Sequence, residues 1–158
     1  MSETAPDPVG KVVGIHHTSH SVSDMDRSLR FYRDLLGMEV VLDTEMEGEM
    51  LEREVALEGA RLRLVELASG GQTMLELLEY YEPKPRPWAD DLRPCDAGAH
   101  HIALTVEDIH AAYEGLLEAG VAFTAPPQEV DAGFFAGHRT VYAYDPDHLI
   151  VELWQVPG

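Results

Sequence analysis

The chain has 158 residues, 45% of them hydrophobic, which is enough to bury the core of one domain or of two small modules sharing a core. Its 29 acidic and 11 basic residues give a formal net charge of −18, which repels phosphate backbones and anionic lipids. No apolar run reaches the roughly 18 residues needed to span a bilayer. We therefore expect no nucleic-acid partner and no membrane partner.

Two further features bear on the cellular compartment in which the protein works. Residues 1–11 are polar and proline-bearing, so we expect a disordered or extended N-terminal segment without the apolar core of a signal peptide. The single cysteine, Cys95, leaves no partner for an intrachain disulfide and fits a reducing environment. These features predict a cytoplasmic protein.

Two histidine pairs indicate that the chain is a duplicated unit. The stretch Gly14-Ile15-His16-His17 matches Gly98-Ala99-His100-His101. Each is followed, at a similar distance, by an apolar run that a single glutamate interrupts: Met74-Leu75-Glu76-Leu77-Leu78 in the first copy and Ile150-Val151-Glu152-Leu153-Trp154 in the second. Four chemically active side chains therefore occupy repeat-equivalent positions.

The first copy, residues 12–81, opens on the histidine strand. A helix is predicted next, capped by Ser23 or Asp24, ended by Gly37, and with a buried stripe formed by Met25, Leu29, Tyr32 and Leu36. Three β-prone runs follow, at Met38–Leu42, Arg61–Leu67 and Thr73–Tyr80, with a turn at Gly70-Gly71 between the last two. The stretch Glu45–Leu57 fits neither a helix nor a strand clearly.

The second copy, residues 98–156, follows a proline-rich linker at 82–97 that we expect to be extended. Its helix is predicted to start after Asp108 and to end at Gly120. The β-prone runs are Val121–Thr124, Arg139–Tyr144 and Leu149–Gln155, with a turn at Asp145-Pro146-Asp147. The irregular stretch Ala125–Gly137 is able to fold over a site. Each copy thus reads strand, helix, three strands, and the fold class is α+β.

Alternation along the strands selects one histidine from each pair. In the second copy His100 shares an apolar face with Ile102 and Leu104, a face suited to packing on the helix, and His101 lies on the opposite face. By repeat symmetry His17 is selected in the first copy, and His16 is expected to turn toward the helix like His100.

The position of the two glutamates is also informative, because each interrupts a strand whose other residues are apolar and look buried. A carboxylate there costs several kcal/mol unless it is paired or ligates a metal. Each residue alone is compatible with a satisfied core histidine or with an edge-strand glutamate facing water. Four at equivalent positions favour one metal site formed by His17, Glu76, His101 and Glu152. Two imidazoles and two carboxylates suit Zn, Ni, Co, Mn or Fe. Trp154, beside Glu152, is either core or a pocket wall.

The tandem plan resembles the vicinal oxygen chelate superfamily, which includes glyoxalase I, methylmalonyl-CoA epimerase, extradiol dioxygenases and the fosfomycin and bleomycin resistance proteins. Three stretches carry the resemblance: Ile15-His16-His17, Phe31-Tyr32-Arg33-Asp34-Leu35-Leu36-Gly37, and Asp145-Pro146-Asp147 before Ile150-Val151-Glu152-Leu153. It implies one domain, residues 12–158, whose two βαβββ modules form a curved mixed sheet around a metal-binding cavity. It also implies that the four residues above match the family's metal-ligand positions.

The resemblance implies three possible activities. With a fourth ligand at Glu76, the ligand set resembles those of glyoxalase I and methylmalonyl-CoA epimerase. This resemblance implies a lyase or isomerase that moves a proton at a carbon next to a carbonyl through a metal-stabilised enediolate. Glu152 and Glu76 are then the candidate bases. A ferrous extradiol dioxygenase would need only His17, His101 and Glu152. A drug-binding or metabolite-binding protein would need no metal. We expect a small-molecule substrate and a homodimer, with the site either within one chain or shared between subunits.

Overall fold

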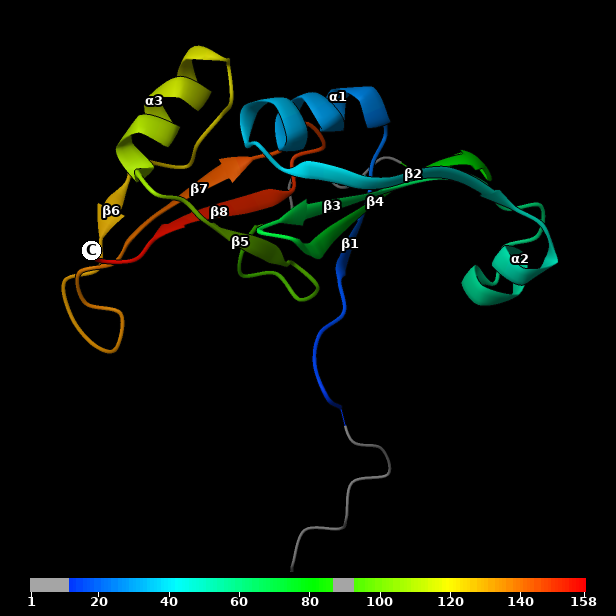
Figure 1. Cartoon of the computed structure of the whole chain (residues 1–158), viewed down its shortest axis with the longest axis horizontal. Coiled ribbons are helices and arrows are strands. Elements are labelled where there is room, and N and C mark those ends of the chain that lie inside the picture. The colour runs from blue at the N-terminus through cyan, green and yellow to red at the C-terminus, as the bar shows by residue number, and fades with distance from the viewer. Residues whose placement is uncertain (1–11, 87–92) are drawn as a thin grey trace, which may run out of the picture.

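The computed structural model describes residues 12–86 and 93–158, and shows two modules side by side (Figure 1). The predicted N-terminal segment 1–11 and part of the predicted linker, 87–92, lie outside the described residues. The first module contains β1 (Thr18–Ser21), α1 (Met25–Leu29), the π-helical η1 (Arg30–Leu35), β2 (Glu39–Glu47), α2 (Glu49–Val55), β3 (Arg61–Ser69) and β4 (Gln72–Glu82). The second contains β5 (His101–Thr105), α3 (Ile109–Glu118), β6 (Gln128–Glu129), β7 (Arg139–Tyr144) and β8 (Ile150–Gln155).

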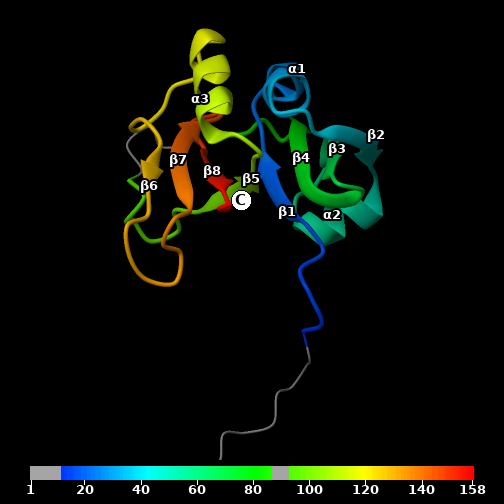
Figure 2. The ribbon, with the colours of Figure 1, turned by 60° about the vertical axis from the view of Figure 1, so that its left-hand side comes forward.

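Each module forms its own four-stranded sheet, with strand orders β1-β4-β3-β2 and β5-β8-β7-β6. The first strand of each module pairs in parallel with the last, and the remaining neighbours are antiparallel. This confirms the tandem βαβββ plan and the α+β class. The sheet of this chain is divided into two, with β1 and β5 at the junction between the halves (Figure 2).

The predicted caps form as expected. The Asp24 carboxylate accepts a hydrogen bond from the Arg27 amide, and the Asp108 carboxylate accepts from the amides of His110 and Ala111. Gly37 and Gly120 follow the helices at φ of 73° and 88°, in the left-handed region that glycine adopts without strain.

One segment differs from the sequence-based predictions, and the structure assigns another that the sequence left ambiguous. Val121–Thr124 forms no strand, and within it only Phe123 makes a bridge, to Ala143 of β7. Pro126 and Pro127, which come one residue later, have no amide hydrogen to continue the pairing, so the edge strand forms further along the chain, at β6. The ambiguous stretch Glu45–Leu57 divides into the end of β2 and helix α2.

One hydrophobic cluster joins the two modules on the side of the sheets that carries α1, η1 and α3. It includes Tyr32 of η1, Leu77 of β4, Ile109 of α3 and Leu153 of β8, all with essentially no solvent exposure. We call the opposite side of both sheets the underside. A smaller hydrophobic cluster packs α2 against the underside of the first module, where Leu51 contacts Leu62. In the described part of the chain, no helix combines the length and apolar character that crossing a bilayer requires.

Polar contacts also tie the modules together at the junction. The Tyr32 hydroxyl donates to the buried Asp145 carboxylate at 2.9 Å, and Arg27 pairs with Asp147 at 2.7 Å. The ring of buried His20, on β1, lies 5.7 Å from the ring of His100. Buried His20 therefore lies at the contact between the two modules.

Stability is expected to fall in mild acid because of His20, whose side chain is 2% exposed. Burial, aided by nearby His100, lowers the pKa of His20 from 6.5 to about 4. The unfolded chain therefore binds this proton more readily, so the free energy of unfolding falls as the pH drops from about 6.5 toward 4. The free energy of unfolding should lose about 2 kcal/mol between pH 7 and 5 from this group alone.

Urea unfolding at several pH values would measure the loss, with His20→Leu as the comparison. The variant should lose less stability than the natural chain over this interval, although Asp145, whose pKa burial raises, acts in the opposite direction in both proteins. Equal losses in the two proteins would show that His20 does not cause the acid sensitivity.

Candidate metal centre

The first predicted pair, His17 and Glu76, comes together beside β1 and β4. These strands pair in parallel with Ser19 opposite Glu76, and the His17 Nε2 lies 3.7 Å from the Glu76 Oε1. The Glu76 side chain is only 13% exposed. The expected helix-side orientation of His16 is wrong: His16 is exposed, and its Nδ1 lies 2.9 Å from the Nδ1 of His17. The reason is that β1 begins after both histidines, so strand alternation does not apply to them.

The second pair, His101 and Glu152, comes together in the same way beside β5 and β8. The His101 Nε2 lies 3.3 Å from the Glu152 Oε2, and the Glu152 side chain is 11% exposed. The other carboxylate oxygen, Oε1, accepts a hydrogen bond of 2.5 Å from the Thr140 hydroxyl. The ring of Tyr142 lies 5.3 Å from the ring of His101. Burial raises the pKa of Tyr142, and the nearby Glu152 carboxylate raises it further, so this phenol stays protonated at neutral pH.

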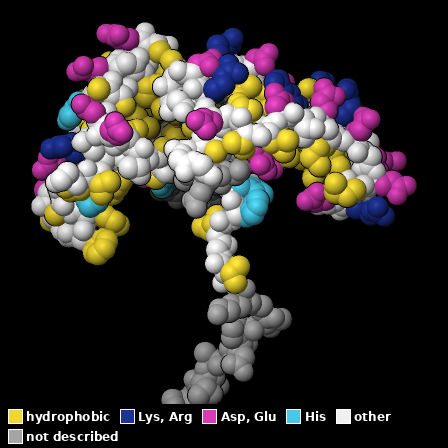
Figure 3. Space-filling view, in the orientation of Figure 1, with side chains coloured by type: hydrophobic (Ala, Val, Ile, Leu, Met, Phe, Trp, Pro, Cys, Tyr) yellow, Lys and Arg dark blue, Asp and Glu magenta, His cyan; other side chains and the backbone are white. Residues whose placement is uncertain are grey.

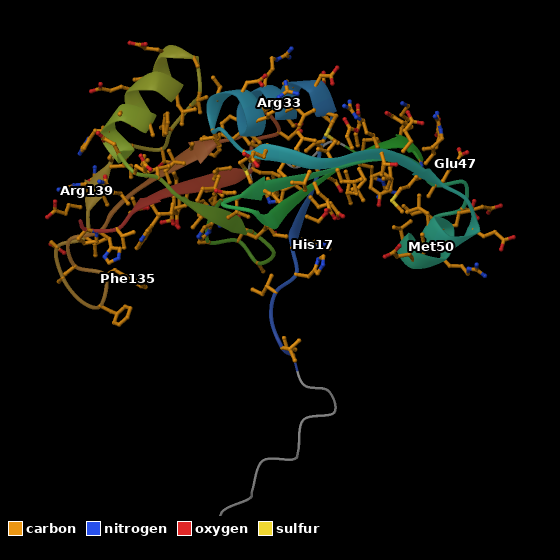
Figure 4. The ribbon with its side chains drawn as sticks, viewed as in Figure 1. His17, Arg33, Glu47, Met50, Phe135 and Arg139 are labelled. Carbon is orange, nitrogen blue, oxygen red and sulfur yellow. The ribbon has the colours of Figure 1, made fainter. Side chains whose placement is uncertain are left out.

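Both pairs belong to the underside. The neighbours of the two glutamates along the strands, Leu75 and Leu77 in β4 and Val151 and Leu153 in β8, are buried in the shared core on the helix side. Alternation then directs Glu76 and Glu152 away from that core. Figure 4 shows His17 below the sheets, between Met50 of α2 and Phe135 of the 131–138 loop. The space-filling view shows that the underside is hollowed, with histidine side chains near its middle (Figure 3).

The four predicted ligands meet as two pairs and not as a group of four. Across residues 12–86 and 93–158, no three His, Cys, Asp or Glu side chains lie close enough together to hold a metal ion. Each pair offers one imidazole nitrogen and one shielded carboxylate, which are donors that divalent transition metals accept. Each pair therefore fits half of the expected coordination shell. We call the His17–Glu76 pair and the His101–Glu152 pair the two half-sites.

The predicted pocket wall, Trp154, belongs to an aromatic cluster on the second module. Its ring lies 5.3 Å from the rings of both Phe135 and His138, and the His138 Nδ1 lies 2.9 Å from the Phe135 carbonyl oxygen. The irregular stretch thus folds back beside β8. Arg139, at the start of β7, pairs with Glu129 at 2.9 Å.

The structure has two clefts of interest, and only the smaller one adjoins a half-site. A cleft of about 210 Å³ adjoins Glu152, lined also by Gln128, Thr140 and Tyr142. A larger one, of about 490 Å³, lies between the end of β1 and the β7–β8 turn, and none of the four predicted ligands lines it. Sequence reasoning missed Thr140. A hairpin register counted outward from the Asp145 turn would have placed Tyr142 opposite Glu152 and Thr140 diagonal to it.

Known proteins are similar to this chain in sequence and in fold. The Glyoxalase/Bleomycin resistance protein/Dioxygenase superfamily matches residues 14–153. A 2-epi-5-epi-valiolone epimerase from Actinomyces sp. is 33% identical over 92% of this chain and 81% of its own. A lactoylglutathione lyase from Haemophilus influenzae is 30% identical over 88% of this chain and 90% of its own. Both relatives carry enzyme names.

Among solved structures, a glyoxalase family protein from Bacillus cereus superposes with a TM-score of 0.82, over 95% of this chain and 98% of that one, at 18% identity. This likeness concerns the fold and includes the placement of both modules. The match of the family model to residues 14–153 shows that this protein belongs to the Glyoxalase/Bleomycin resistance protein/Dioxygenase superfamily.

Proposed function

We propose that this protein is a divalent-metal-dependent lyase or isomerase that moves a proton at a carbon next to a carbonyl group. The observation that carries the proposal is the pair of repeat-equivalent half-sites, each with a histidine nitrogen within 3.7 Å of a shielded carboxylate. The relatives named by activity, an epimerase and a lyase, belong to the two proposed reaction classes.

The metal centre is completed between two copies of the chain. One half-site supplies two donors, whereas a divalent transition metal in a protein usually takes three or four. In a twofold dimer, the His17–Glu76 half-site of each copy faces the His101–Glu152 half-site of the other, giving two equivalent centres. The underside carries both half-sites and is hollowed (Figure 3), and it is the surface that the second copy would cover in this dimer.

The residues of the centre have separate tasks in this reaction. When bound, a divalent cation polarises the substrate carbonyl and offsets the charge that develops on its oxygen. His17 and His101 hold the cation as neutral ligands. A carboxylate of Glu76 or Glu152 takes the proton from the adjacent carbon and returns it. Trp154 and Phe135 provide an apolar wall beside Glu152 for the substrate.

Proton exchange with solvent tests the proposal. Protein freed of metal and reloaded separately with Ni²⁺, Co²⁺, Zn²⁺, Mn²⁺ or Fe²⁺ would be incubated in deuterated water with a polyhydroxylated cyclic ketone and with the methylglyoxal–glutathione hemithioacetal. At least one metal should bind stoichiometrically and promote deuterium incorporation next to the carbonyl. Metal-dependent oxygen uptake with catechol, without any exchange, would establish the dioxygenase activity instead, and failure to bind any of these metals would favour a binding protein.

A further inference from the structure

The two carboxylates of the half-sites are held differently. One oxygen of Glu152, Oε1, accepts the 2.5 Å hydrogen bond from the Thr140 hydroxyl, while the other, Oε2, lies 3.3 Å from the His101 Nε2. A hydrogen bond to one carboxylate oxygen restricts the orientation of the side chain, and such supporting contacts commonly orient metal ligands. The protein itself therefore restrains the orientation of the Glu152 carboxylate.

The first module has no counterpart of this hydrogen bond. Strand register places Tyr142 opposite Glu152 and Glu66 opposite Glu76, so the position that corresponds to Thr140 is Leu64. A leucine side chain donates no hydrogen bond, and Leu64 packs instead against the apolar cluster under α2. Within the described part of the chain, Glu76 accepts no hydrogen bond, and its contact with the His17 Nε2 is longer, at 3.7 Å.

Solvent exposure does not account for this asymmetry, because the side chains of Glu76 and Glu152 are almost equally exposed, at 13% and 11%. The neighbouring groups differ instead. Glu76 has another carboxylate, that of Glu66, directly across the antiparallel pair, and like charges in that arrangement repel. Glu152 has the tyrosine ring of Tyr142 at the same place. Glu76 is thus the less restrained of the two carboxylates.

We infer that Thr140 is a positioning residue that fixes Glu152 as the permanent carboxylate ligand, and that Glu76 is the carboxylate that carries the proton. This inference rests on the proposed function. In the step it describes, the C–H bond next to the substrate carbonyl breaks and the proton passes to a Glu76 oxygen. The electron pair stays with the substrate and is delocalised onto the carbonyl oxygen. Return of the proton from Glu76 restores a C–H bond.

Metal affinity, measured by competition with a chromophoric zinc chelator, tests the role of Thr140. Thr140→Val removes the hydroxyl at nearly constant volume and should weaken Zn²⁺ binding by about 10-fold to 100-fold. Thr140→Ser keeps the hydroxyl and should restore most of the affinity. Thr105→Val is the matched control, because Thr105 is exposed on β5 of the same module and makes no hydrogen bond to Glu152. Thermal melting of each apo-protein checks that the variants fold.

The exchange reaction at saturating Zn²⁺ tests the division of roles. Glu76→Gln should lower the turnover for deuterium incorporation by at least about 100-fold while zinc remains bound. Glu152→Gln should mainly raise the zinc concentration that exchange requires. Unchanged zinc affinity in Thr140→Val, or exchange that survives Glu76→Gln but is lost in zinc-loaded Glu152→Gln, would overturn the inference. The proposed function fails separately, if the natural chain neither binds metal nor exchanges protons.

Discussion

Alanine at either His17 or His101 is expected to weaken metal binding by more than about 100-fold and to abolish proton transfer. Each histidine is one of the two donors of its half-site, with its Nε2 within 3.7 Å of a shielded carboxylate. Removing the imidazole leaves that carboxylate as the only donor from its module. The losses should be similar for the two variants although they lie in different modules, because in the proposed centre each half-site contributes one histidine and one carboxylate.

Equilibrium dialysis followed by elemental analysis would measure the bound metal, and deuterium incorporation would measure the proton transfer. His110→Ala is the matched control, because His110 is an exposed histidine on α3, on the helix side of the sheet. It should bind metal as the natural chain does. Full metal binding by His101→Ala, or an equal loss in His110→Ala, would contradict the assignment of the half-sites.

Local features of the fold were predictable because they depend on neighbouring residues. Asp108 and Gly120 bound α3 as expected, since a side-chain cap and a left-handed glycine act within one helical turn. The repeat also located the two His–Glu pairs, because register inside a module follows from its short hairpin and its parallel pair. The edge strand escaped prediction, since the apolar run Val121–Thr124 is β-prone but Pro126-Pro127 prevents its pairing from continuing.

The arrangement of the half-sites was not predictable from spacing. Repeat symmetry shows which residues are equivalent but not how one module sits against the other. That placement depends on contacts between distant segments, such as the Tyr32 hydroxyl on Asp145 and the shared apolar core. The orientation of His16 was missed for a related reason, because alternation holds only once a strand is paired and β1 starts at Thr18.

Complementation between inactive variants should restore a metal centre if that centre forms between two copies. One variant carries His17→Ala and Glu76→Ala, which removes the first half-site. The other carries His101→Ala and Glu152→Ala, which removes the second. In a mixed dimer, one centre combines both damaged halves, whereas the other combines two intact halves. The mixed dimer should therefore regain about half of the natural metal content and proton-transfer activity.

The most direct measurement is the metal content of mixed dimers, purified by a different affinity tag on each variant after co-expression. We predict roughly one bound metal per mixed dimer, about two per dimer of the natural chain, and none in either variant alone. A mixed dimer that binds no metal, while the natural chain binds one ion per copy, would contradict the account and place each centre within a single chain.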